Sequence, residues 1–348
     1  MEIRKFTVSR DDKYYHAFPD VALTRSGKLV CLISECIHHS DRSYTRIAIR
    51  ESSDRGRTWS GKRYLTPPSQ GMPYWNCPRI TTLADGRLAA VVDSVGTKER
   101  GGEYDKLRNC LWFSDDEGGT WTGPVETPAL GIVPDRLREL SDGSWLLSCH
   151  VSDSQTGFLV QRAWRSPDGG RSWTGPFIVA RKHGLNLCEA SVLEIGPGTL
   201  VALLRENSFR GWDAYKTISM DGGMTWSEPI PFPLPGCHRP VAGFLMDGRV
   251  MITFRFMQGG KGWLGTWTQN FFAAVTDRES LLARAREDAW TRIMPLDYDR
   301  SLRSDLGYSG WVQFPDGEIY TVSYIVDDWP RGQIRGYSFN PDAFALSE

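Results

Sequence analysis

The chain repeats itself, and this is the feature that most restricts its fold. The pattern S-x-D-x-G-x-[ST]-W occurs as SSDRGRTW, SDDEGGTW, SPDGGRSW and SMDGGMTW, beginning at Ser52, Ser114, Ser166 and Ser219. The copies are roughly fifty to sixty residues apart, which is the length of a four-stranded propeller blade. Within each copy, Ser and Asp can bond nearby backbone, Gly allows a positive φ, and Trp can anchor the turn. The pattern therefore predicts one recurring hairpin turn per blade.

A second repeat, a strand–turn–strand unit, occurs six times. The units begin at Phe18, Cys77, Pro134, Glu189, Arg239 and Tyr308, and each has a turn glycine nine residues later, at Gly27, Gly86, Gly143, Gly198, Gly248 and Gly317. Apolar residues flank each turn, as in buried hairpins. Six such units predict an all-β fold, a six-bladed β-propeller with four-stranded antiparallel blades that forms one domain over residues 1–348.

Two further segments complete this arrangement. The first strand-like segment, residues 2–8, and a late one, residues 333–339, both alternate in polarity, so we expect them to share the last blade and close the ring. The fifth unit lacks the Asp-containing turn. Its stretch 277–288, DRESLLARARED, predicts a short helical insertion instead.

Composition excludes several classes of function. The formal net charge is −1 with both signs mixed along the chain, which argues against a nucleic-acid binder and against a polybasic membrane contact. The N-terminus shows no secretory pattern, and this favours a cytoplasmic protein. The seven cysteines form no metal-binding spacing, so we expect free thiols, no metal and no cofactor. No oligomeric state is predicted.

The hairpin geometry nominates a site. In an antiparallel hairpin, the start of the first strand and the end of the second lie together, opposite the turn. The ends of all six hairpins should therefore surround the axis on one face of the ring. Polar groups that converge in a depression mark a candidate active site. The candidates at these ends are His16, Glu35, Trp75, Asp93, His150, Glu189, Arg205, His238, Arg239, Arg255 and Tyr308.

The Asp-containing turns, the unit that runs from Glu189 to Arg205, and Tyr308-Ser309 ahead of an Asp-Gly turn resemble the sialidase (neuraminidase) superfamily. The resemblance implies a tyrosine nucleophile at Tyr308 with Glu189 as its base. It also implies one substrate-clamping arginine at Arg205 and an acid/base at Asp41. The implied activity is that of a retaining, exo-acting glycoside hydrolase with an oligosaccharide or glycoside substrate.

The chain departs from this family at the clamp. Sialidases have Arg-Ile-Pro on the first hairpin, whereas this chain has HAFPD, and no arginine stands in the stretch 265–272 where the third is expected. Arg239 or Arg255 could replace a missing arginine. Because a lost bidentate contact in a desolvated pocket weakens binding by a few kcal/mol, we expect a terminal sugar other than sialic acid.

Three alternatives remain open. They are an exo-sialidase with a rebuilt arginine clamp, a non-catalytic glycan-binding propeller, and a polysaccharide lyase acting on uronic-acid oligosaccharides. The lyase would use histidines of the rim (His16, His150 or His238) together with Arg239. Trp75 and Trp263 are candidates to stack on a sugar ring.

Overall fold

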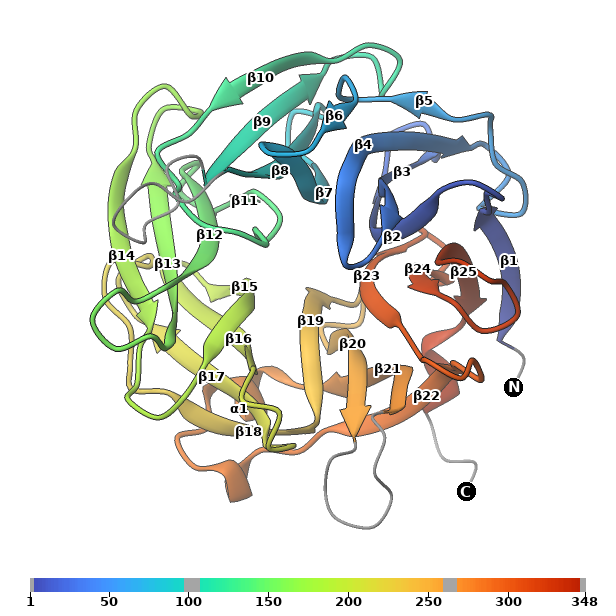
Figure 1. The fold of residues 1–348 in the computed structure, drawn as a ribbon. Helices are drawn as coiled ribbons and strands as arrows, with labels where there is room; N and C mark the ends of the chain where they lie inside the picture. Colours follow the sequence, from blue (N-terminus) through green and yellow to red (C-terminus); the bar gives the residue numbers. More distant parts are fainter. Residues whose placement is uncertain (1–2, 97–106, 259–267, 345–348) are drawn as a thin grey trace.

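Six antiparallel sheets surround a central axis (Figure 1). The structure, a computed structural model, describes residues 3–96, 107–258 and 268–344. Within these residues, five sheets have four strands and one has five, which confirms the predicted six-bladed propeller.

The first three blades follow one another in the sequence. The first contains β2 (Tyr15–Leu23), β3 (Leu29–His38), β4 (Asp41–Ser52), β5 (Arg63–Tyr64) and β6 (Ser69–Gln70). The second contains β7 (Tyr74–Thr82), β8 (Leu88–Val95), β9 (Arg108–Ser114) and β10 (Thr122–Glu126). The third contains β11 (Arg138–Glu139), β12 (Trp145–Ser152), β13 (Leu159–Ser166) and β14 (Thr174–Ala180).

The last three blades bring the chain back to its start. The fourth contains β15 (Leu187–Gly196), β16 (Thr199–Glu206), β17 (Asp213–Ser219) and β18 (Ile230–Pro235). The fifth contains β19 (Cys237–Phe244), β20 (Val250–Gln258), β21 (Thr268–Thr276) and β22 (Arg292–Tyr298). The sixth contains β23 (Leu306–Gln313), β24 (Ile319–Ile325), β25 (Gln333–Phe339) and β1 (Arg4–Ser9).

The two ends of the chain close the ring in the sixth blade, as predicted. Strand β1 pairs antiparallel with β25, with Arg4 opposite Ser338 (Figure 1). Ionic contacts extend the closure to the fifth blade, because Lys5 of β1 and Arg335 of β25 both contact Asp297 of β22. The backbone ladder and these ion pairs together connect the start of the chain to its last two blades.

The Asp-containing turns have the geometry that their sequence predicts. In the first copy, Ser52 Oγ accepts from Gly56 N at 2.8 Å, Asp54 Oδ1 accepts from Thr58 N at 2.9 Å, and Trp59 Nε1 donates to the Gly56 carbonyl at 3.1 Å. The other three copies repeat these contacts. Their polar groups bond within the turn, so these aspartates serve the fold.

The fifth blade carries the helical insertion that the sequence predicts. Helix α1 (Arg278–Leu282) begins after Asp277, whose Oδ1 accepts from Ser280 N at 2.7 Å, and η2 (Arg286–Asp288) follows. Among the helices described, none has the length and apolarity that a membrane crossing needs.

A backbone irregularity recurs where the inner strands approach the axis. Phe18, Val133, Glu189, Arg239 and Tyr308 all have positive φ, between 40° and 52°. In four of these five blades the register of the inner strand shifts at this point, as in a β-bulge. Non-glycine residues with positive φ are uncommon and cluster at functional sites. In the third blade the residue is Val133, one position before the predicted Pro134.

A buried ion cluster holds the inner strands of three blades together. Asp20 on β2 accepts from Arg136 Nε at 2.9 Å and from Ile80 N at 3.0 Å, and its side chain is 0% exposed. Arg79 on β7 lies 3.9 Å from the same carboxylate and donates to the Ser309 carbonyl at 2.9 Å. Burial raises the pKa of Asp20, but Arg136 and Arg79 outweigh it, so the pKa is lowered and the carboxylate stays ionised.

We predict that Asp20→Asn lowers the free energy of unfolding by about 3–5 kcal/mol at pH 7, because it leaves Arg136 buried without a counter-charge. Folding depresses the pKa of Asp20. The stability difference between wild type and variant is therefore fully present above the pKa that Asp20 has in the unfolded chain, and it shrinks as pH falls through the native pKa. Urea unfolding at several pH values measures it. Asp247→Asn, at an exposed pair with Arg249, is the control and should have little effect. A similar small effect for Asp20→Asn would contradict the prediction.

Candidate active site

Three of the predicted residues meet near the axis. Tyr308 on β23 donates its hydroxyl hydrogen to Glu189 Oε1 on β15. Arg205 on β16 places Nη1 2.9 Å from Oε1 and 3.0 Å from Oε2 of the same carboxylate. Tyr308, Glu189 and Arg205 are 7%, 4% and 6% exposed. The positive φ at Tyr308 and Glu189 marks the bulges from which these two side chains meet.

The charges of this group fix where the proton lies. Burial raises the pKa of Glu189, but the Arg205 guanidinium outweighs burial and lowers the pKa to about 2. Burial and the neighbouring Glu189 carboxylate raise the pKa of Tyr308 well above its usual value. The resting site therefore holds an ionised acceptor, Glu189, hydrogen-bonded to a protonated phenol, Tyr308.

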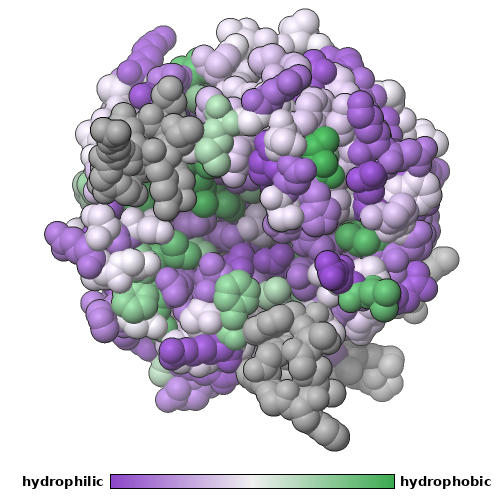
Figure 2. All heavy atoms as spheres, in the orientation of Figure 1, coloured by the Kyte–Doolittle hydropathy of each residue, from purple (hydrophilic) through white to green (hydrophobic). Residues whose placement is uncertain are grey.

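Three more arginines surround the same tyrosine. The Cζ atoms of Arg79, Arg239 and Arg255 lie 6.0, 5.7 and 5.6 Å from the centre of the Tyr308 ring. Each has buried guanidinium nitrogens with no hydrogen-bond partner among the described residues: Nε and Nη2 of Arg79, Nε and Nη1 of Arg239, and Nε of Arg255. Unpaired buried donors are unfavourable unless a ligand supplies acceptors. Hydrophilic residues are visible in the central hollow of the face drawn in Figure 2.

Two predicted histidines lie next to these groups and are neutral at pH 7. Burial lowers the pKa of His150 to about 4. Burial, with Arg205 and Arg255 nearby, lowers that of His238 further, and its Nδ1 lies 3.3 Å from Arg255 Nη2. His150 also lines a pocket of about 220 Å³ with the apolar side chains of Val95, Leu107, Ile132, Val151 and Leu159.

The segment Ala17-Phe18-Pro19 stands where the family resemblance calls for Arg-Ile-Pro, so the first clamp arginine is missing. The ring of Phe18 packs 4.8 Å from the ring of Tyr308, centre to centre. Arg42, on the β3–β4 hairpin, places Cζ 5.0 Å from the Phe18 ring, and its buried Nη1 has no partner among the described residues. The same hairpin carries Asp41, which is exposed and accepts from Ser43 N at 3.0 Å. These contacts place the hairpin over Phe18.

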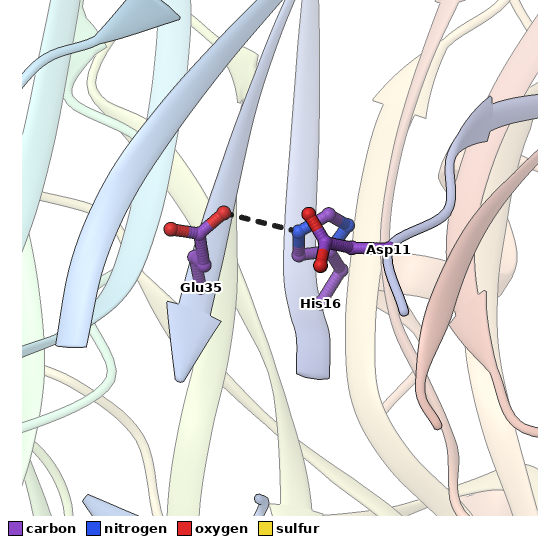
Figure 3. Close-up of side chains that lie close together, drawn as sticks. All are labelled: Asp11, His16 and Glu35. Atoms are coloured by element: carbon purple, nitrogen blue, oxygen red, sulfur yellow. Dashed lines mark hydrogen bonds and ion pairs between the residues drawn. The ribbon is translucent and has the colours of Figure 1, made fainter. Parts of the chain in front are cut away.

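His16 and Glu35 belong to a separate cluster in the first blade (Figure 3). His16 Nε2 lies 3.2 Å from Glu35 Oε2, and Asp11 completes three groups whose potential ligand atoms lie within 4.8 Å of one another. Lys62 Nζ contacts both carboxylates, at 2.6 Å from Glu35 Oε2, and Tyr44 donates to Oε1 at 3.0 Å. An ammonium thus already supplies the cation that a metal would bring, so this chemistry fits an ion-pair cluster better than a metal site.

Two other candidates are held in packing roles. Asp93 is fully buried and accepts from Asn76 Nδ2, Cys77 N and Val133 N at 2.9, 2.6 and 2.8 Å. These bonds link the inner parts of the second and third blades, and burial raises the pKa of Asp93. Trp75 packs edge-on to the Trp112 ring at 5.3 Å, which leaves it only partly exposed. Trp263 lies outside the described residues.

Sequence reasoning missed four residues that contact this region. Arg79 lies two positions after the start of the second strand–turn–strand unit, so its place on an inner strand could be predicted from the sequence. Arg42 and His39 belong to the polar segment HHSDR, in which Asp41 was the one predicted site residue. Asp305 precedes Tyr308 by three positions and had no local signal, because its partners come from other strands.

Comparison with known proteins now identifies the family. The profile of the BNR repeat-like domain matches residues 45–321, most of the chain. The chain belongs to the BNR-repeat sialidase superfamily. It is 24% identical over 255 residues to an anhydrosialidase of Macrobdella decora, covering 65% of this chain and 30% of that protein. It is also 24% identical over 244 residues to a sialidase of Clostridium perfringens, covering 62% of each chain. The chain thus spans less than two thirds of the length of these relatives.

Solved structures agree on the fold. A Dyadobacter fermentans protein of unknown function superimposes with a TM-score of 0.80 at 21% identity, over 97% of this chain and 98% of that one. A Hadza microbial sialidase gives 0.73 at 20% identity, over 97% and 69%. Trypanosoma rangeli sialidase in complex with sialic acid gives 0.66 at 16% identity, over 97% and 59%.

We predict that Arg205→Met destabilises the protein by about 3–5 kcal/mol at pH 7, because Glu189 then stays buried without its counter-charge. In the wild type, ionised Glu189 adds to the free energy of unfolding at every pH above the pKa it has in the unfolded chain. This stabilisation is lost as pH falls towards the native pKa of about 2. In the variant, Arg239 and the Tyr308 hydroxyl still lower the pKa of Glu189, but without Arg205 burial weighs more and the pKa rises, so the penalty shrinks on acidification. The stability difference should therefore shrink between about pH 7 and pH 3 in urea unfolding.

The control is the same substitution in a Glu189→Gln background. Because the glutamine side chain has no titrating carboxyl, the effect of Arg205→Met there should be smaller and independent of pH. An equal pH dependence in both backgrounds would show that some other group causes it.

Proposed function

We propose that this protein is a retaining, exo-acting glycoside hydrolase whose substrate carries a terminal acidic sugar. The observation that carries the proposal is the contact between Tyr308 and Glu189 beneath a ring of arginines. Five ionisable groups, one carboxylate and four guanidinium groups, lie around the tyrosine ring, so the local charge is strongly positive. A bound anion would relieve that charge and accept hydrogen bonds from the unpaired guanidinium nitrogens.

The Tyr308–Glu189 pair suits a reaction at an anomeric carbon that bears a carboxylate. A neutral phenol can approach such a centre without the repulsion that a carboxylate nucleophile would meet. As the Tyr308 oxygen bonds to the anomeric carbon, its proton passes to Glu189, which is already hydrogen-bonded to it. A covalent glycosyl-tyrosine then forms, and its hydrolysis gives retention of configuration.

The substrate itself can strengthen the base. Arg205 holds the pKa of Glu189 at about 2, which makes Glu189 a weak proton acceptor in the empty site. A substrate carboxylate that draws on the same guanidinium weakens its hold on Glu189. The pKa of Glu189 then rises towards that of a useful base. Binding of the acidic group and activation of Tyr308 are thereby coupled through Arg205.

Arg205, Arg239 and Arg255 supply the clamp in this proposal. Arg239 is anchored by the Pro134 carbonyl at 2.6 Å from Nη2, which leaves its other nitrogens for the substrate. Arg255 is anchored by weaker contacts of 3.4 Å to Gln269 and to the Leu306 carbonyl. Without the first arginine, the clamp differs from the one that the family resemblance implies. Sialic acid carries its carboxylate on the anomeric carbon and uronic acids carry it elsewhere on the ring, so testing both shows which position the clamp accepts.

We predict that aryl glycosides of terminal acidic sugars release their aglycone, and that Tyr308→Phe and Glu189→Gln each lower kcat/KM by at least about 10³-fold. Tyr298→Phe, at an exposed tyrosine of β22, is the matched control and should act as wild type. Release from sialic acid would identify a rebuilt sialidase clamp. An unsaturated, ultraviolet-absorbing product would instead identify a lyase, and no product from any sugar would favour a glycan-binding protein.

We predict that Arg255→Met raises KM and lowers kcat/KM by about 10- to 10³-fold for the acidic substrate, since one charge-assisted contact is worth roughly 1.5–3 kcal/mol or more in a buried site. The loss should be small for the same glycoside with its carboxylate converted to a primary amide. Arg249→Met, at an exposed hairpin turn, is the control. An equal loss for the acid and the amide would rule out a clamp role.

A further inference from the structure

A histidine–aspartate pair, to which the family resemblance assigns no role, lies at the rim of the site. His39, on the β3–β4 hairpin, places Nδ1 2.6 Å from Oδ2 of Asp305, which precedes β23. Asp305 is held from the other side as well. Tyr15 donates to Oδ2 at 2.6 Å and Tyr324 donates to Oδ1 at 2.8 Å.

The pair stands next to the reacting tyrosine. The ring of His39 packs edge-on to Phe18 at 5.3 Å, and the ring of Tyr308 lies 4.8 Å from the same Phe18 ring. His39 and the nucleophile of the proposed reaction therefore both contact the ring of Phe18. The His39 side chain is 40% exposed, whereas the Asp305 side chain is 19% exposed, so solvent or substrate can reach the imidazole.

The hydrogen bonds assign the tautomer of His39. Burial raises the pKa of Asp305, but the hydrogen bonds from His39 and Tyr15 outweigh it and lower the pKa, so the carboxylate is ionised. An ionised carboxylate only accepts, and Nδ1 of His39 must therefore carry the hydrogen. Nε2 has no hydrogen-bond partner within the described parts of the chain and is the nitrogen left to exchange a proton.

We propose that His39 is the acid/base catalyst of the glycosidase reaction and that Asp305 positions it. The inference rests on the proposed function above. In the first step, Nε2–H of the imidazolium protonates the glycosidic oxygen while the C–O bond breaks and Tyr308 Oη bonds to the anomeric carbon. In the second step, neutral Nε2 takes a proton from water, whose oxygen attacks the anomeric carbon. The bond between that carbon and Tyr308 Oη breaks, and Glu189 returns its proton to Tyr308. The net reaction consumes one water and releases the sugar and the aglycone.

Asp41, to which the resemblance assigns this role, is less well placed. Its carboxylate is exposed and accepts hydrogen bonds from Ser43 of its own turn, which lower its pKa. A carboxyl with a lowered pKa is a poor proton donor at neutral pH. His39, two residues earlier on the same hairpin, has a second residue to orient it.

The test compares two leaving groups on the acidic sugar that the wild type hydrolyses. A 2,4-dinitrophenol departs without protonation, whereas phenol needs a proton from the enzyme. His39→Ala and His39→Gln should lower kcat/KM for the phenyl glycoside by about 10²–10⁴-fold and for the dinitrophenyl glycoside by less than about 10-fold. Added azide should restore turnover by attacking the glycosyl-enzyme without base assistance. The glutamine of His39→Gln can still donate a hydrogen bond to Asp305. This variant should therefore keep the hairpin folded while it removes the titrating imidazole.

Asp305→Asn should show the same leaving-group dependence in weaker form, as expected of a positioning residue. His38→Ala, at the exposed neighbour that bonds Ser40, is the matched control and should keep the wild-type dependence. The proposal is overturned if the His39 variants lose activity equally on both glycosides, or if Asp41→Asn alone shows the selective loss and azide rescue. Failure of the glycosidase function itself looks different, because the wild type would then release neither aglycone.

Discussion

Closure of the ring is the constraint on which the rest of this structure depends. Pairing of β1 with β25 fixes the sixth blade beside the first, and only then do Tyr308 and Phe18 come into contact. The same closure brings Asp305 to the β3–β4 hairpin and Arg79 to the Ser309 carbonyl. A propeller without this closure would leave an open edge and a divided site, because Tyr308 and Phe18 come from opposite ends of the chain.

The axis of the ring combines two different uses of buried charge. Around Asp20, the guanidinium groups are matched by a carboxylate and by backbone carbonyls, so this layer stabilises the fold. Around Tyr308, four guanidinium groups face one carboxylate and keep unpaired donors. Stability would favour neutralising these donors within the protein. Unpaired buried donors of this kind are typical of functional sites, which commonly depart from the rules of stable folding.

The bulges on the inner strands connect these two layers. A regular strand would send successive side chains to alternate faces, so neighbouring positions could not both serve the axis. The positive φ at Phe18, Glu189, Arg239 and Tyr308 breaks this alternation where each strand reaches the site. At Glu189 and Tyr308, two such residues hydrogen-bond to each other.

The sequence by itself determined the blade count, the ring closure, the helical insertion and the meeting of Tyr308, Glu189 and Arg205. These follow from local patterns, since turn residues and alternating polarity act within a few positions, and repetition places equivalent positions at one end of the ring. Tertiary structure alone decided that Glu35 and His16 pair with Lys62 and that Asp93 ties strands together. It also decided that Arg79, His39 and Asp305 reach the site. These outcomes depend on which side chains from distant blades occupy the same space, and a hydrogen bond between residues 266 positions apart leaves no pattern in the local sequence.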